Sequence, residues 1–117
     1  MSIANGQKRS IKSSQRAIRQ LHFIVSADGT TVTGLDKNQV SVADTGTGVK
    51  TVTLNNAFAS SDYSVQVTVA TADAIANVEI TSSSVFVIDT LDATDGTTAK
   101  DAIVHVAVTG SDVSDRY

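Results

Sequence analysis

Two histidines are the side chains of this chain best suited to acid–base or metal chemistry, because imidazole titrates near neutral pH and binds transition metals. His22 and His105 lie far apart in the sequence, each inside a short apolar run. Neither has a second metal ligand at local spacing, and neither belongs to a recognisable pattern with a nucleophilic serine. We therefore expect both on the outer faces of strands, solvated or hydrogen-bonded, and assign no metal ligand and no catalytic residue.

The other residue types that carry out catalysis are either missing or not arranged for it. The chain has no cysteine, so it has neither a thiolate nucleophile nor a disulfide. Serine and aspartate are plentiful, but no serine lies in a nucleophile elbow, and Glu79 is the one glutamate that a glycosidase pair could use. The segment Gly46-Thr47-Gly48 lacks the lysine and the following helix of a phosphate-binding loop. We expect no enzymatic activity and no cofactor.

A series of aspartates at three-residue spacing raises the question of a calcium site. Asp89, Asp92 and Asp95 recur in a polar segment, and carboxylate oxygens are ligands that Ca²⁺ accepts. Their spacing differs from the alternating pattern of a calcium-binding loop. Aspartate also forms turns by accepting hydrogen bonds from nearby backbone amides. We favour this turn-forming role.

Positive charge is concentrated at the start of the chain. Residues 1–19 hold five cations and no acid, whereas residues 20–117 hold four bases against twelve acids. Few large apolar residues accompany the five cations, so we predict an extended basic arm over 1–19 and a folded acidic domain over 20–117. The cations of the arm are Lys8, Arg9, Lys12, Arg16 and Arg19.

Two roles remain open for the arm. It could dock on an acidic surface or a phosphate backbone, or it could have no partner, either as a solvated tail that aids solubility or as a segment that folds back on its own acidic domain. We take its five cations as the candidate partner-binding residues. The arm has no aromatic residue that could stack on a base, which disfavours sequence-specific and single-strand nucleic-acid binding. The acidic domain places nucleic acid last among the partners.

The elements that must position these residues are strands. Val, Ile and Thr make up a third of the chain, and these β-branched side chains suit a pleated surface. The clearest strand runs from Tyr63 to Val69, where apolar and polar residues alternate. Seven to eight such short strands, separated by turn signals, predict an antiparallel β-sandwich, with a jelly-roll winding as one alternative. Ala70 to Ala76 is expected to be a loop or a single turn, and no apolar run is long enough to span a membrane.

The few aromatic residues receive separate predictions. Tyr63 and Phe86 are expected in the core because they lie on the apolar faces of predicted strands. Phe58 lies in a link between strands, where it could close one end of the core or reach a neighbouring subunit. Tyr117 is a candidate for an intersubunit contact. The shortage of exposed aromatic rings disfavours a sugar-binding module.

Two stretches of the sequence resemble small virion proteins of tailed bacteriophages. The segment from Val40 to Phe58, VSVADTGTGVKTVTLNNAF, is similar to a hairpin in which a TGTG turn leads into a strand and then into an N-A-F link. The segment from Val104 to Ser111, VHVAVTGS, is similar to the final strand of those proteins. Lys50 stands where they usually have an aromatic residue. By pattern, the resemblance covers roughly residues 39–110.

The resemblance implies a structural role on a virus particle. It indicates a capsid decoration (cement) protein or the base of a head fibre, commonly trimeric and attached outside the shell. The implied partners are the major capsid protein or neighbouring virion subunits, and assembly takes place in the host bacterial cytoplasm, for which a chain without disulfides is suited. The alternative is a tail-fibre or head-fibre module that binds a host receptor or glycan.

Overall fold

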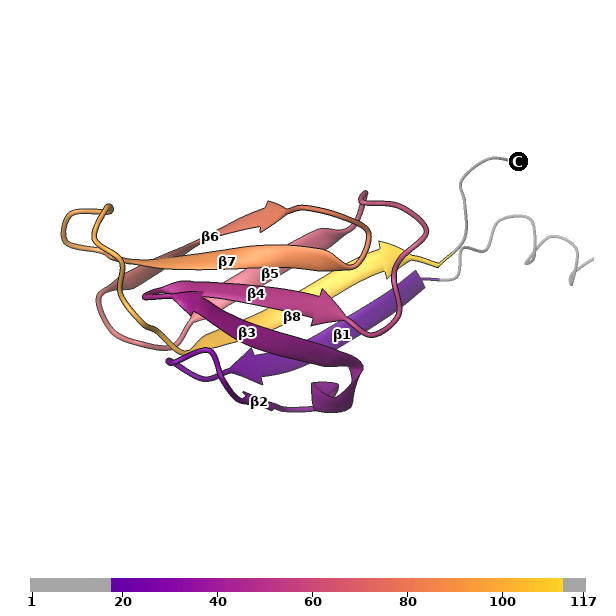
Figure 1. Cartoon of the computed structure of the whole chain (residues 1–117), viewed down its shortest axis with the longest axis horizontal. Coiled ribbons are helices and arrows are strands. Elements are labelled where there is room, and N and C mark those ends of the chain that lie inside the picture. Colours follow the sequence, from indigo (N-terminus) through magenta and orange to yellow (C-terminus); the bar gives the residue numbers. More distant parts are fainter. Residues whose placement is uncertain (1–17, 113–117) are drawn as a thin grey trace, which may run out of the picture.

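The protein is a two-layered β-sandwich, as the sequence predicts. A computed structural model describes residues 18–112, which form eight strands and one short 3-10 turn, η1 (Figure 1). The elements in chain order are β1 Ile18–Val25, β2 Val32–Thr33, η1 Lys37–Gln39, β3 Val40–Gly46, β4 Val49–Leu54, β5 Ser64–Val69, β6 Ala74–Ile80, β7 Val85–Asp92 and β8 Val104–Ser111. No helix among these residues is long and apolar enough to cross a membrane.

The strands divide into two antiparallel sheets of four. Sheet 1 has the order β2-β1-β8-β5, and sheet 2 has the order β3-β4-β7-β6. Consecutive strands form hairpins within a sheet at β1–β2, β3–β4 and β6–β7. The other four connections, β2–β3, β4–β5, β5–β6 and β7–β8, cross from one sheet to the other. The winding therefore combines hairpins with crossings, instead of crossing at almost every step as a jelly roll does.

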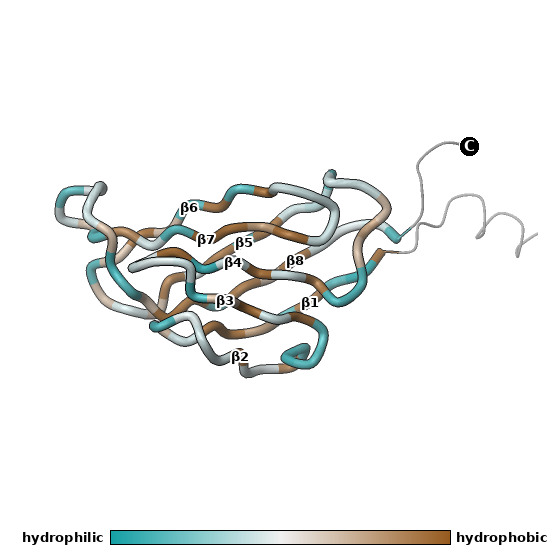
Figure 2. Tube along the Cα trace, in the orientation of Figure 1, coloured by the Kyte–Doolittle hydropathy of each residue, from teal (hydrophilic) through white to brown (hydrophobic). Residues whose placement is uncertain are grey.

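The core lies between the sheets and follows the alternation of the strands. In β5 the valines face the other sheet, and Ser64, Gln66 and Thr68 face outward, as the period-2 pattern predicts. Tyr63 and Phe86 are both buried, which confirms their assignment to the core. Figure 2 shows hydrophobic residues along the strands and hydrophilic residues in the loops that join them.

Two strands are longer than the sequence predicts. The strand β6 begins at Ala74, inside the segment predicted to be a loop, and β7 continues to Asp92, into the polar segment whose aspartates were predicted to form turns. The two additions are partners, because Ala74 pairs with Asp92 and Ala76 pairs with Thr90. Pairing between β6 and β7 stabilises both extensions. The residue pattern of one strand taken alone does not show which residues its partner strand will pair with, so it does not predict these extensions.

The two ends of the sandwich differ in their contents. At the terminal end, β1 begins and β8 ends side by side, with Ile18 paired to Ser111 (Figure 1). At the loop end lie the connections after β1, β3, β5 and β7. Most of the carboxylates of the described residues gather in or next to those connections, namely Asp28, Asp44, Asp73, Asp92, Asp95 and Asp101.

Candidate functional site

The terminal end of the sandwich is the place where the predicted arm joins the folded domain. The structure corrects the boundary between them, because β1 begins at Ile18 rather than at residue 20. Ile18 and Arg19 extend the ladder with β8 by pairing with Ser111 and Gly110. The apolar and charge patterns did not reveal this extension, since it depends on a partner strand some ninety residues away.

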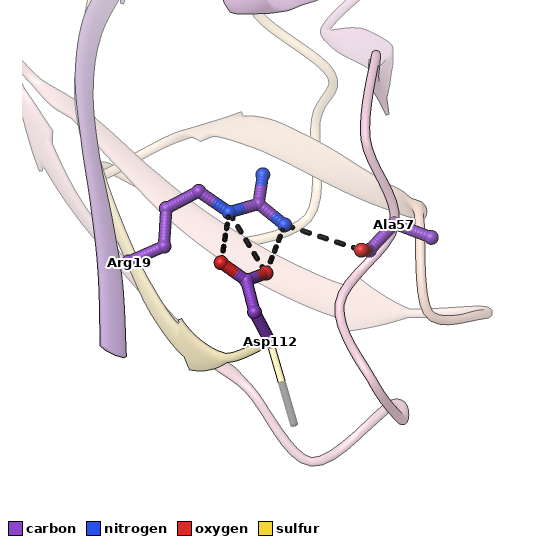
Figure 3. A network of polar contacts seen from close by, with 3 residues as sticks. All are labelled: Arg19, Ala57 and Asp112. Carbon is purple, nitrogen blue, oxygen red and sulfur yellow. Dashed lines mark hydrogen bonds and ion pairs between the residues drawn. The ribbon is translucent and has the colours of Figure 1, made fainter. Parts of the chain in front are cut away.

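Arg19 is held by the folded domain instead of serving as a free cation of the arm. Its Nε lies 3.0 Å from Asp112 Oδ1 and its Nη2 lies 2.7 Å from the same oxygen, so the two side chains form a fork-like ion pair. The Nη2 group also donates to the carbonyl of Ala57 at 3.2 Å (Figure 3). Arg19 therefore joins the first strand, the last residues of the ladder and the β4–β5 link.

Phe58 closes the terminal end of the core. It is 4% exposed, its ring centroid lies 4.9 Å from that of Tyr63, and the Arg19 guanidinium carbon lies over the Phe58 ring, 4.2 Å from its centroid. Gly110 leaves space for this packing, since a Cβ there would lie only 2.7 Å from Phe58 Cδ1 and 2.7 Å from Tyr63 Cβ. This burial agrees with the prediction that Phe58 closes one end of the core, and its contact with a neighbouring subunit stays a prediction.

The remaining predicted partner-binding residues lie outside the described residues. These are Lys8, Arg9, Lys12 and Arg16 on the N-terminal side and Tyr117 on the C-terminal side. Without Arg19, residues 1–17 still carry four cations and no acid, while residues 18–117 carry five bases and twelve acids. Chain continuity joins this cationic segment to Ile18, at the terminal end of the sandwich.

Replacing Arg19 with methionine is expected to destabilise the sandwich by about 1–2 kcal/mol, from the lost cation–π contact and a partly exposed ion pair. Methionine keeps most of the packing over Phe58 but removes the hydrogen bonds to Asp112 and Ala57. Urea unfolding measures the change. The stability of Arg19→Lys, which keeps the positive charge but not the two-pronged contact with Asp112, should lie between those of the wild type and the methionine variant. A methionine variant as stable as the wild type would show that the contacts of Arg19 do not stabilise the sandwich.

At the loop end, aspartates organise their own turns. Asp92 Oδ1 accepts hydrogen bonds from the backbone N–H and the hydroxyl of Thr94. Asp95 accepts from the backbone N–H groups of Thr97 and Thr98 and from the Thr98 hydroxyl. These contacts agree with the turn-forming interpretation, and residues 18–112 contain no group of three side chains placed to hold a metal ion.

The pKa of Asp95 is expected to be about 2, because the Thr98 hydroxyl and two backbone N–H groups stabilise its ionised form. A lowered pKa in the folded state means a contribution to stability that is present above the ordinary value of 3.8. That contribution is lost as the pH falls toward 2. Carboxyl chemical shifts followed by NMR measure this directly. A midpoint at the ordinary value would show that the turn is open in solution.

Lys50 is the feature that sequence reasoning missed. The alternation of β4 turns Lys50, Val52 and Leu54 into the core, so Lys50 is only 1% exposed. Its Nζ has no hydrogen-bond partner among the described residues. Burial lowers the pKa of its amine, and the charges of three nearby aspartates, Asp101, Asp44 and Asp28, oppose this in part. The spacing of residues 50, 52 and 54 was the available signal.

A shallow groove of about 360 Å³ lies on the outer face of sheet 1. His22 and His105 both line it and are exposed, which confirms their predicted place on outer strand faces. Gln66 and Thr68 of β5 line its other side, and Leu35, 82% exposed, lies at its rim. None of the residues lining the groove is Asp, Glu, Lys or Arg.

The rim of the groove is built on a fixed loop. Asp36 donates its backbone N–H to the carbonyl of His22, and its carboxylate accepts the N–H of His22 at 2.7 Å. Gly34 has a φ of +102°, and a Cβ there would lie 3.2 Å from Phe23 Cα, so the loop approaches β1 as only glycine allows. Leu35 is thereby exposed at a defined place.

Comparison with known proteins adds no identification: no protein-family description, no curated protein and no solved structure matches this chain.

Proposed function

We propose that this protein is a non-enzymatic structural protein that decorates or cements a bacteriophage capsid. The observation that carries the proposal is the separation of charge along the molecule. Four cations precede the terminal end, and the acidic loops gather at the opposite end. Such a molecule attaches to an acidic surface through one end and presents the other end to solvent.

The geometry of the terminal end supports attachment through the arm. Arg19, Phe58 and Asp112 fix the first strand to the β4–β5 link and to the end of β8. A load on residues 1–17 is therefore passed to both sheets rather than to one frayed strand. Many copies, each with a modest contact to the shell or to a neighbouring subunit, reinforce one another through multivalency.

Co-sedimentation with undecorated capsids tests the proposal. The wild type should pellet with capsids and be released as salt is raised, because exposed charge pairs are screened. A variant with Lys8, Arg9, Lys12 and Arg16 all changed to Gln should lose binding. The matched control is Lys37→Gln, which removes an exposed cation of the folded domain. Failure of the wild type to pellet, or undiminished binding of the fourfold variant, would refute the proposal.

The groove on sheet 1 favours a second candidate function, a fibre module that binds a host glycan. Its walls offer hydrogen-bonding side chains and an apolar rim at Leu35 with no Asp, Glu, Lys or Arg among them, which suits a neutral sugar better than an ion. It contains no exposed aromatic ring for stacking, so we rank it second.

Glycan-array binding separates the two functions. Binding through the groove should survive deletion of residues 1–17 and should be lost in the double variant Gln66→Ala/His105→Ala, whose side chains are exposed and have no part in the core. Glycan binding that disappears with residues 1–17, or that ignores the double variant, would remove this candidate.

A further inference from the structure

We propose that β5 is a self-association surface, at which β5 of a second copy of this chain pairs antiparallel and extends sheet 1 into a continuous sheet across a two-fold axis. The inference does not depend on what residues 1–17 bind. It is based on a comparison of the four strands at the edges of the two sheets.

Three of the four edges carry features that prevent pairing with another chain. The edge strand β2 is only two residues long, and beyond its end the carboxylate of Asp36 accepts the backbone N–H of His22 in the neighbouring strand β1. The edge strand β3 has an irregularity between Asp44 and Gly46. The edge strand β6 exposes the charge of Glu79. Short strands, bulges and charges are the usual means of protecting an edge.

The fourth edge, β5, has none of these features. It is six residues long, its register with β8 is unbroken, and its sequence SVQVTV contains no charge, no glycine and no proline. No described strand lies on its outer side. A regular, uncharged edge strand of this composition is a template for adding another strand.

The hydrogen-bonding groups of β5 that face away from β8 can be identified. Ala70 donates its N–H to Ile103 of the chain segment leading into β8. In antiparallel pairing, N–H and C=O of alternate residues point to the same side. Gln66 and Thr68 therefore bond β8, whereas Val65 and Val67 direct their N–H and C=O toward the free edge.

The core-facing side chains of β5 are also incompletely buried. Val65, Val67 and Val69 face the core yet remain half-buried, while the core-facing valines of the neighbouring β8 are 3% exposed or less. An added strand would cover the exposed parts of these valines. On the outer face the pairs would join Ser, Gln and Thr, which tolerate one another across strands.

A second copy of this chain is the partner that fits this edge. Residues 18–117 carry a net charge of −7, so two copies repel each other over most of their surface. From Tyr63 to Ala72 the sequence has no charge, and an antiparallel pairing of β5 with itself brings no like charges together. Such an edge contact is small, so we expect a dissociation constant in the micromolar range, roughly 1–100 µM.

Sedimentation equilibrium of the full chain tests the proposal. The wild type should pass from 12.1 kDa toward twice that mass as its concentration rises. The double variant Gln66→Lys/Thr68→Lys places lysines of the two copies next to each other when β5 pairs antiparallel with itself. It should weaken dimerisation at least tenfold. The control Gln20→Lys/Thr53→Lys makes the same change of charge at exposed positions of the interior strands β1 and β4, and should dimerise like the wild type.

Amide exchange gives an independent readout of the same pairing. The N–H groups of Val65 and Val67 should exchange more slowly as concentration rises, while those of Gln66 and Thr68 are protected at all concentrations. A wild type that stays monomeric at millimolar concentration would overturn the proposal. An oligomer that persists in the Gln66→Lys/Thr68→Lys variant would also overturn it, and so would an oligomer in which the N–H groups of Val65 and Val67 exchange freely. Both outcomes apply equally to the trimer implied by the phage resemblance.

Discussion

Replacing Gly48 with alanine is expected to lower the free energy of unfolding by about 3 kcal/mol or more, from a left-handed backbone and a backbone clash together. Gly48 has a φ of +70°, and a Cβ there would lie 2.4 Å from the carbonyl oxygen of Thr90 and 3.0 Å from the backbone nitrogen of Lys100. Neither atom belongs to a flexible side chain, so the strands themselves would have to separate.

The contacts around Gly48 explain why the effect is large. Its N–H donates to Asp101 at 2.8 Å, and its carbonyl accepts the N–H of Thr90 at 2.7 Å. Thr90 is fully buried, and its hydroxyl bonds the carbonyls of both Gly48 and Lys100. A shift of the turn therefore breaks the attachment of β4 to β7 and to the long loop at once.

Gly96→Ala is the matched control for this prediction. Gly96 has nearly the same φ, +69°, but a Cβ there would meet no atom within 4 Å. It should show the conformational term alone, about 1 kcal/mol. Urea unfolding of both variants separates the two contributions. Equal losses in the two variants would show that the turn at Gly48 relaxes freely and that the packing of Thr90 is not critical.

Replacing Lys50 with methionine is expected to raise the free energy of unfolding by about 1–3 kcal/mol, because an unpaired buried amine is exchanged for an apolar chain of similar shape. The methylene groups of Lys50 already pack in the core beside Ile88, its partner in β7, and against Gly29 of the β1–β2 turn. Methionine preserves these contacts and removes the desolvated Nζ.

The pH dependence provides a second check on Lys50. Because burial lowers the pKa of Lys50 in the folded state, the unfolded chain binds its proton more tightly. The stability of the wild type should therefore rise relative to Lys50→Met as the pH increases toward the usual lysine value of 10.5. Comparing the two proteins cancels the titration of other groups. A methionine variant that is less stable than the wild type, with no pH-dependent difference, would show that Nζ is satisfied in solution.

Local patterns were sufficient for the class of fold. The alternation from Tyr63 to Val69 correctly predicts which side chains of β5 face the core, and the turn after β1 contains Asp28-Gly29, a dipeptide that favours hairpin turns. Both signals depend on residues close together in the chain. The start of β1 and the joint extension of β6 and β7 depend on partner strands, which is why the sequence placed those boundaries wrongly.

The candidate site was harder to predict for a related reason. Arg19 looked like a fifth cation of the arm because nothing near it in the sequence opposes its charge, yet its carboxylate partner, Asp112, is supplied by the other end of the chain. Lys50 received no prediction of burial, because the apolar residues at 49, 52 and 54 do not alternate regularly, and the register of β4 shows that it enters the core. The groove joins side chains of β1, β5 and β8 with a loop residue, so no single segment could reveal it.

The copy number of this chain in purified virions tests the central claim most directly, and quantitative mass spectrometry of intact particles measures it. A capsid decoration protein is expected at a number comparable to that of the main shell subunit, with copies lost when the shell is washed at high salt. A chain that is absent from the particle, or present in only the few copies of a tail or fibre part, would contradict the account.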